Sequence, residues 1–330
     1  MSLTATETET MTLRDAITQA LREELARDDD VVIWGEDVGE SGHVSNLTEG
    51  LYEEFGPEWV RDAPLAENGF VGAGVGAAAT GLRPVVDTMY ADFFGVACEQ
   101  MLNQMTKMHY MFGGQLDVPL VVRASEGAGL NAAAQHSKTP HTILAHMTGS
   151  TVVTPGTPAA AKGLLKSAIR SDDPVFFFEN KRTYTDTGEV PVDEDFAVPI
   201  GEASVEREGA DVTVAATQAF VGEALDLADR LAGTVSLEVV DLRSLYPLDH
   251  ETLAESVRKT GRLVVADESP LSYGTHAEVV ARTNETAFYY LDAPPQRVGW
   301  PDTPVPFAPP LEDEVMPTAE DLQRAIERLA

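Results

Sequence analysis

The sequence has one cysteine, Cys98, and few lysines, with none before Lys107. A single thiol cannot form an intramolecular disulfide or a cysteine-based metal cluster, so we expect a reducing compartment, the cytoplasm. The first residues have neither a basic start nor an apolar run, and no later apolar run is long enough to span a bilayer. We therefore expect no signal peptide and no membrane segment, and residues 1–10 are predicted to be a disordered leader.

Positive charge is also scarce, because 23 Lys and Arg face 54 Asp and Glu, which gives a formal net charge of -31. The hydrophobic content of 43% is that of a globular protein, so the acidic residues must lie on a folded surface. They are spread along the whole chain, which indicates a surface adapted to high intracellular salt, where screening removes self-repulsion. Such a surface excludes nucleic acid and anionic membranes as partners.

Two domains are expected, because 330 residues exceed the size at which one hydrophobic core usually stops growing. In residues 11–185, helical and strand patterns alternate, which predicts an α/β domain with a doubly wound, mainly parallel sheet. The predicted elements of this domain are a helix from Thr12, a strand at VVIWGED, strands at 84–89, 119–123, 151–154 and 174–179, and helices at 95–110 and 159–170.

A polar, proline-bearing stretch, residues 186–209, is predicted to be a linker. Residues 210–330 then alternate again, which predicts a second, smaller α/β domain. Its predicted elements are strands at VTVAA, SLEVVDL and RLVVADE, and helices through 224–231, from His250, from Thr275 and from Thr318.

A run of small residues holds Gly72, Gly74 and Gly76, with Asp87 downstream, and looks like half of a dinucleotide-binding fingerprint. That fingerprint needs a strand leading directly into the first glycine, whereas here a loop and a helix start precede it. Asp87 also comes too early for the ribose-binding acid. We therefore favour a Gly/Ala helix packed closely against a sheet or a partner helix, and keep a nicotinamide-dependent oxidoreductase as an alternative of a different class.

Glu67 precedes these glycines at the start of the predicted helix, where the helix dipole alone favours an acid by ~0.3–1 kcal/mol. The sequence around Glu67 also indicates a functional role. Six segments along the chain carry a family resemblance: PLAENGFVGAGVGAAATGLRPVV, YADFFGVACEQMLNQMTK, AAAQHSK, AKGLLKSAIRSDDPV, DLRSLYPLD and DAPPQRV. In this order they resemble the beta subunits of thiamine-diphosphate-dependent 2-oxo acid dehydrogenases and of the closely similar acetoin dehydrogenases. The resemblance implies a transketolase-like pyrimidine-binding domain followed by a transketolase-like C-terminal domain.

The same resemblance implies roles for three side chains. Glu67 would hydrogen-bond N1′ of the cofactor's aminopyrimidine ring and exchange a proton with it. Phe93 would stack on the pyrimidine face, and Phe94 takes this place if the register differs by one residue. His136 would lie toward the substrate channel and assist transfer of the acyl group to a lipoyl arm. A non-catalytic scaffold with a decayed enzyme fold is a third class, disfavoured because all three residues are present.

The resemblance also implies a structural potassium ion, held mainly by backbone carbonyls. Ser171 and Asp173 stand where many relatives have Asp and Asn, which weakens this prediction. The candidate ligands are Leu120, Ala168, Ile169, Ser171 and Asp173.

The chain lacks the Gly-Asp-Gly segment with which relatives hold magnesium and the cofactor's diphosphate; Gly35-Glu36-Asp37 is nearest and has no second glycine. A separate alpha subunit is therefore expected to hold both, in an α2β2 heterotetramer that the Gly72–Gly81 helix contacts. The C-terminal domain is expected to contact a dihydrolipoyl acyltransferase core and its lipoyl domain. The expected reaction is decarboxylation of a 2-oxo acid, pyruvate before others, with reductive acylation of lipoyllysine; the alternative substrate is acetoin.

Overall fold

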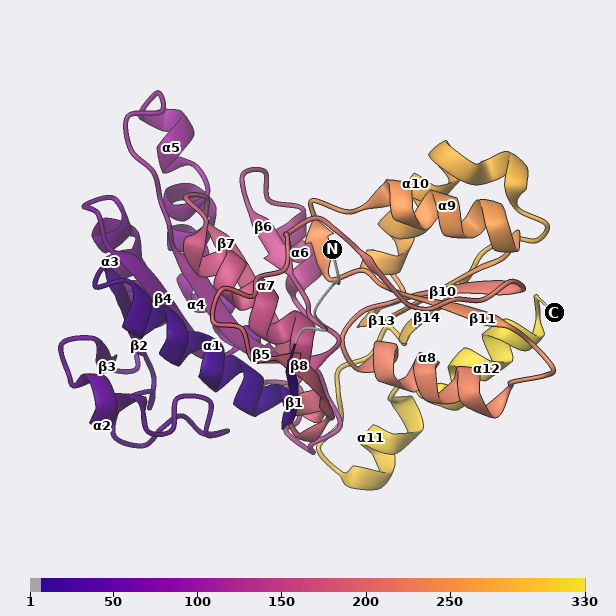
Figure 1. Cartoon of the computed structure of the whole chain (residues 1–330), viewed down its shortest axis with the longest axis horizontal. Coiled ribbons are helices and arrows are strands. Elements are labelled where there is room, and N and C mark those ends of the chain that lie inside the picture. The colour runs from indigo at the N-terminus through magenta and orange to yellow at the C-terminus, as the bar shows by residue number, and fades with distance from the viewer. Residues whose placement is uncertain (1–6, 330) are drawn as a thin grey trace.

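The computed structural model describes residues 7–329, which form two α/β domains lying side by side (Figure 1). The first contains a seven-stranded sheet in the order β12-β6-β7-β5-β4-β2-β3, parallel except for β12, which pairs antiparallel with β6. β12 comes from the second half of the sequence, so the two halves share this sheet. Its strands are β2 (Val31–Gly35), β3 (Val60–Asp62), β4 (Arg83–Tyr90), β5 (Val121–Glu126), β6 (Thr151–Val153), β7 (Val175–Asn180) and β12 (Ser244–Tyr246).

Helices cover both faces of this sheet. Successive residues of a strand point to opposite faces, and here both are apolar, so both faces must be buried. Val85 packs with the helices α1 and α7, whereas Val86 packs with α3 and α4 on the opposite face. The helices are α1 (Leu13–Arg27), α2 (Leu51–Phe55), α3 (Glu67–Ala78), α4 (Phe94–Glu99), α5 (Met108–Met111), α6 (His141–Ala145) and α7 (Pro158–Arg170), with short 3-10 turns at Ala91–Phe93 and Lys181–Thr185.

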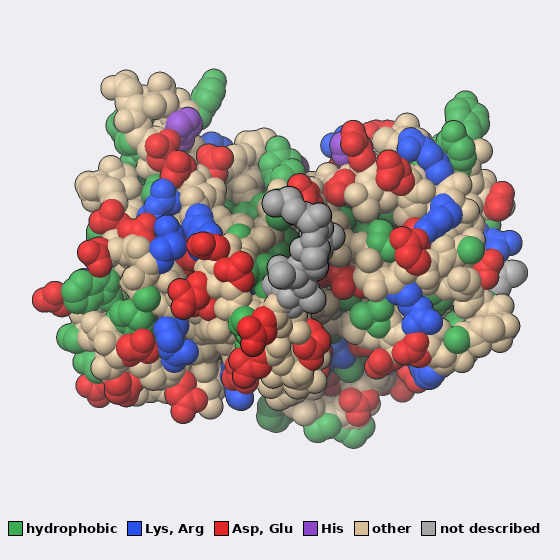
Figure 2. Space-filling model, viewed as in Figure 1, with side chains coloured by type: hydrophobic (Ala, Val, Ile, Leu, Met, Phe, Trp, Pro, Cys, Tyr) green, Lys and Arg blue, Asp and Glu red, His purple; other side chains and the backbone are tan. Residues whose placement is uncertain are grey.

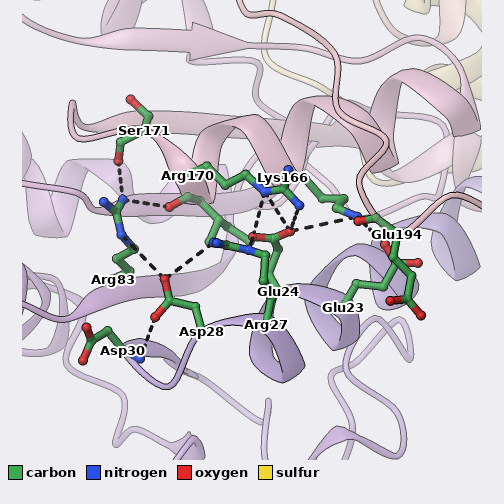
Figure 3. A network of polar contacts seen from close by, with 11 residues as sticks. Glu23, Glu24, Arg27, Asp28, Asp30, Arg83, Lys166, Arg170, Ser171 and Glu194 are labelled. Carbon is green, nitrogen blue, oxygen red and sulfur yellow. Dashed lines mark hydrogen bonds and ion pairs between the residues drawn. The ribbon is translucent and has the colours of Figure 1, made fainter.

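Buried ion pairs join α1 to α7 (Figure 3). The ammonium groups of Lys162 and Lys166 are fully buried and both contact Glu23, at 2.8 Å for Lys162. Arg170 pairs with the equally buried Glu24 at 2.7 Å. Because each buried charge has a partner, the two helices can approach closely despite the lysines in their interface.

The second domain has a five-stranded sheet in the order β14-β13-β10-β11-β9, in which only β9 is antiparallel to its neighbour. α8 and α12 cover one face, and α9 and α10 cover the other (Figure 1). Its elements are β9 (Ser204–Arg207), β10 (Val212–Ala216), α8 (Ala219–Arg230), β11 (Leu237–Asp241), α9 (His250–Thr260), β13 (Leu263–Pro270), α10 (Thr275–Ala287), a 3-10 turn at Phe288–Tyr290, β14 (Gln296–Trp300), α11 (Pro309–Val315) and α12 (Ala319–Glu327).

Most predicted elements are confirmed within one to five residues, and three details differ. The predicted helix 95–110 is interrupted by a π-helical turn at Gln100–Met105. Residues 8–10 of the expected leader lie in β1 (Thr8–Thr12), which pairs with β8 (Thr187–Pro191), while residues 1–6 lie outside the described part. β8 and β9 both fall in the predicted linker, where pairing with β1 and β11 outweighs the weak strand propensity of the segment.

Acidic side chains are scattered over both domains in the face shown in Figure 2, as the spread of acid along the sequence predicts. Among residues 7–329, no helix is long and apolar enough to cross a membrane.

Candidate active site

Four side chains from distant parts of the sequence follow strands at one edge of the first sheet. Glu36 follows β2, Glu67 follows β3 as the first residue of α3, Phe93 follows β4, and His136 lies in the loop after β5. These four strands are parallel neighbours, so their carboxyl ends lie on the same side. In open parallel sheets this edge is where ligands bind, and the topology places three sequence-predicted residues there together.

The rings of Tyr90, Phe93 and His136 form an edge-to-face cluster. The His136 centroid lies 4.7 Å from that of Tyr90 and 5.6 Å from that of Phe93. Lys181, which follows β7, donates a hydrogen bond to the His136 carbonyl oxygen and lies 5.1 Å from the Tyr90 ring centre. Phe94 instead packs against the apolar core, so of the two phenylalanines Phe93 is the one beside His136.

Glu36 is a member of this group that the sequence reasoning did not select. Its side chain is buried, and its Oε1 has no hydrogen-bond partner among the described residues. Burial, followed by the negative charges of Glu67 and Asp87, raises the pKa of Glu36 to about 7. A buried carboxyl group that titrates near neutrality beside a second carboxyl group is typical of sites that move protons.

A strained bend at Met89, near the end of β4, precedes Phe93; the pairing of β4 with β5 shifts register there, between Asp87 and Tyr90. Met89 has a left-handed backbone, with φ of 61°, which is unusual for a residue other than glycine. Its N–H donates to Asp87 Oδ1 at 2.7 Å, and Ser125 Oγ donates to its carbonyl oxygen at 2.5 Å. The other oxygen of Asp87 pairs with the buried Arg123. Asp87 therefore helps to shape the turn that precedes Tyr90 and Phe93.

These contacts overturn the dinucleotide-binding alternative. Asp87 is buried and engaged by Arg123, so it cannot bind a ribose. Gly74 lies inside α3, where a Cβ atom would stand 2.8 Å from Val86 Cγ2 and 3.2 Å from Leu120 Cδ1. The glycine is needed because α3 packs closely on the sheet, as favoured above.

Two of the predicted potassium ligands contact Arg83, and Figure 3 shows one of them, Ser171, beside it. Its guanidinium donates to the carbonyl oxygens of Ile169 at 3.2 Å and Ser171 at 2.9 Å. The carbonyl oxygens of Leu120 and Ala168 also accept backbone hydrogen bonds. The Arg83 guanidinium is bonded to two of the five predicted carbonyl ligands, and its positive charge opposes a second cation there. The potassium site therefore stays a prediction. Within residues 7–329, no group of three or more His, Cys, Asp or Glu side chains is placed to hold a metal.

Family comparisons agree with this architecture. Residues 9–187 match the family described as "Transketolase, pyrimidine binding domain", and residues 201–322 match "Transketolase, C-terminal domain". A solved structure titled "Split gene transketolase, inactive beta4 tetramer" superposes with a TM-score of 0.77 at 25% identity, covering 97% of this chain and 98% of that one. The fold is thus that of a transketolase-like protein.

Relatives with similar sequences show which transketolase-like family the chain belongs to. The chain is 44% identical to pyruvate dehydrogenase E1 component subunit beta-1, mitochondrial, of Arabidopsis thaliana, covering 96% of this chain and 89% of that one. It is 43% identical to the 2-oxoisovalerate dehydrogenase subunit beta of Bacillus subtilis (97% and 98%) and 41% identical to the acetoin:2,6-dichlorophenolindophenol oxidoreductase subunit beta of the same organism (94% and 95%). The chain belongs to this thiamine-diphosphate-dependent family of dehydrogenase beta subunits.

Proposed function

We propose that the chain is the beta subunit of a pyruvate dehydrogenase that decarboxylates pyruvate and acylates lipoyllysine, and that it is active only with an alpha subunit. The observation that carries this proposal is that Glu67, Phe93 and His136 all follow strands at the carboxyl edge of the sheet, where the Phe93 and His136 rings are in contact and Glu67 acts on the buried Glu36. We place the protein in the cytoplasm on the evidence of its sequence alone.

The residues present fit thiamine diphosphate. When bound, the cofactor supplies a nucleophilic carbon and an electron sink for decarboxylation. Glu67, on the first turn of α3, would hold N1′ of the pyrimidine and exchange a proton with it. Phe93 would orient the ring by stacking, and the unpartnered Glu36 Oε1 is an acceptor available to a ligand's donor. His136 would move a proton during transfer to the lipoyl arm.

The alpha subunit completes the proposed α2β2 assembly and holds magnesium and the diphosphate. The missing Gly-Asp-Gly segment supports this division. Leu65, two residues before Glu67, is 84% exposed, which is unusual for a large apolar side chain next to a polar site. A subunit that covers this edge would bury Leu65 and exclude water from Glu67. The C-terminal domain would contact the acyltransferase core.

Acetoin is the second candidate substrate. The chain is 43% identical to the acetoin:2,6-dichlorophenolindophenol oxidoreductase subunit beta of Cupriavidus necator, close to its identity with pyruvate dehydrogenase subunits. The segment MFGGQLDVP also resembles the acetoin branch. Identity therefore does not separate the substrates, and an assay must.

The test is reconstitution. The chain is purified with its candidate alpha subunit in high salt, and reduction of 2,6-dichlorophenolindophenol is followed with pyruvate, branched-chain 2-oxo acids or acetoin, in the presence of thiamine diphosphate and magnesium. Turnover with pyruvate above the others, and only by the assembly, is expected. Glu67→Gln should assemble normally and lose at least about a hundredfold in kcat, whereas Glu53→Gln, an exposed control, should not. Activity of the isolated chain contradicts the half-site, and near wild-type turnover of Glu67→Gln removes Glu67 from the mechanism.

A further inference from the structure

The loop that carries His136, residues 127–140, has a strained backbone with few hydrogen bonds within the loop. Gly127, Gly129, Asn131 and Ala133 all have left-handed φ values, of 89°, 89°, 56° and 59°. Asparagine and alanine pay a steric cost in this conformation, so it persists only where surrounding contacts determine it. Two backbone hydrogen bonds lie within the loop: one from Gly127 to Lys138, which links its ends, and one from His136 to Ala133, each at 3.3 Å.

The determining contacts come from the second domain. Glu312, on α11, is buried, and its two carboxylate oxygens accept the N–H groups of Gly129 at 2.9 Å and Asn131 at 2.8 Å. One side chain thus bonds two of the four left-handed residues from a segment about 180 residues away in the sequence. Hydrogen bonds to a charged acceptor are stronger than neutral ones, so this contact is suited to hold a strained backbone.

Further contacts hold the loop against the same domain. Thr139 donates to the carbonyl oxygen of Glu268 at 3.1 Å, and Ala128 packs in a small apolar cluster with Trp300 and Val305. On the side of the first domain, Lys181 donates to the His136 carbonyl. The ring of His136 therefore lies beside Phe93 in a loop that both domains hold.

We propose that Glu312 is a positioning residue: it fixes the loop 127–140 and so makes the placement of His136 depend on the C-terminal domain. This inference rests on the proposed function of His136 in acyl transfer. Glu312 does not face the cluster of Tyr90, Phe93 and His136 directly; it acts through the backbone of Gly129 and Asn131. The C-terminal domain would then contribute to the chemistry as well as to assembly.

The test uses the α/β assembly and compares two rates. Acylation of a free lipoyl domain needs His136 under the proposal, whereas dichlorophenolindophenol reduction does not. Loss of folded protein lowers both rates together, but a displaced His136 lowers their ratio. Glu312→Gln should lower this ratio roughly tenfold, the effect of one weakened charged hydrogen bond, and Glu312→Asp should lower it less. Glu314→Gln, the same change at an exposed position of α11, should leave it unchanged. In a double variant with His136→Ala, Glu312→Gln should add nothing.

Amide hydrogen exchange supplies a readout independent of catalysis. In Glu312→Gln, exchange at Gly129 and Asn131 should be faster by about tenfold or more, with no change in Glu314→Gln. Unchanged exchange shows that Glu312 does not hold the loop and overturns the proposal. Faster exchange with an unchanged rate ratio, while His136→Ala lowers the ratio, overturns the positioning role. If His136→Ala itself leaves the ratio unchanged, the proposed role of His136 fails, and the exchange data alone decide whether Glu312 fixes the loop.

Discussion

Removal of Arg123 should destabilise the first domain more than removal of any exposed arginine. Arg123 lies inside the sheet and bridges Asp87 on β4 and Glu179 on β7, with its second contact to Glu179 at 3.0 Å. The side chains of all three residues are at most 2% exposed. Arg123→Met keeps most of the volume but leaves two buried carboxylates without their cation.

The expected loss is about 3–5 kcal/mol of unfolding free energy, the usual cost of breaking a buried ion pair from one side. Typical domains have a total of about 5–15 kcal/mol, so the variant should be close to its limit of stability. Arg123→Lys should rescue only part, because one ammonium group cannot serve two carboxylates in the fork geometry of a guanidinium. Arg230→Met, at an exposed helix end, is the control and should change stability by less than about 0.5 kcal/mol.

The loss should also depend on pH. Burial raises the pKa of Glu179 to about 7, and Arg123 opposes that rise. A group whose pKa is raised on folding stabilises the fold fully below its unfolded pKa and loses this contribution as pH rises through the folded value. Without Arg123 the folded pKa rises further, so Arg123→Met should cost at least about 1 kcal/mol more near pH 8.5 than near pH 5.5.

Urea unfolding at constant high KCl, followed by tryptophan fluorescence at both pH values, measures these quantities. A loss under about 1 kcal/mol at the higher pH, or an equal loss at both, would refute the view that Arg123 compensates two buried carboxylates. Because Asp87 also holds the turn at Met89, the same variant should reduce turnover of the assembly beyond the fraction that is unfolded.

Three more predictions follow from the site and the surface. Glu36→Gln should assemble normally, lower kcat by about tenfold and remove an ionisation near pH 7 from the pH–rate profile, since the Glu36 carboxyl is protonated below that pH and charged above it; an unchanged profile would exclude Glu36 from the reaction. Because Arg83 already holds the carbonyl groups of Ile169 and Ser171, the melting temperature should be equal in KCl and NaCl at equal concentration, and a higher value in KCl would favour a potassium site there. With a net charge of -31, unfolding free energy should fall on dilution from about 2 M to about 0.1 M KCl, and constant stability would contradict adaptation to salt.

The sheet and its helices could be predicted because their signals are local. Val85 and Val86, or Val121 and Val122, form apolar runs that only a sheet covered on both faces buries. The pairing of β1 with β8 was missed because it joins residues about 180 positions apart, and no local pattern marks Thr8–Thr12 as the partner of Thr187–Pro191. The addition of β12 to the sheet of the other domain is hidden for the same reason.

The site was partly predictable, and the part that was missed is informative. Glu67, Phe93 and His136 stand in motifs that carry a family resemblance, so their order in the sequence was enough. Glu36 was considered only as a failed diphosphate motif, because its significance depends on burial and on carboxyl neighbours after other strands. Glu312 could not be selected, since its partners are backbone N–H groups, which have no sequence signal.

Two buried carboxyl groups at the sheet edge support the proposal that a cofactor or a second subunit completes the site. Oε1 of Glu36 and Oδ2 of Asp92 are both buried and without a donor in the described residues, and they follow the neighbouring strands β2 and β4. A buried acceptor without a partner costs about 1–3 kcal/mol, so donors brought by a ligand, a partner chain or water would stabilise these two. The family's cofactor and the alpha subunit can both bring donors to this edge. The proposed half-site is therefore supported by two unsatisfied acceptors as well as by the missing Gly-Asp-Gly motif, and these two observations are independent.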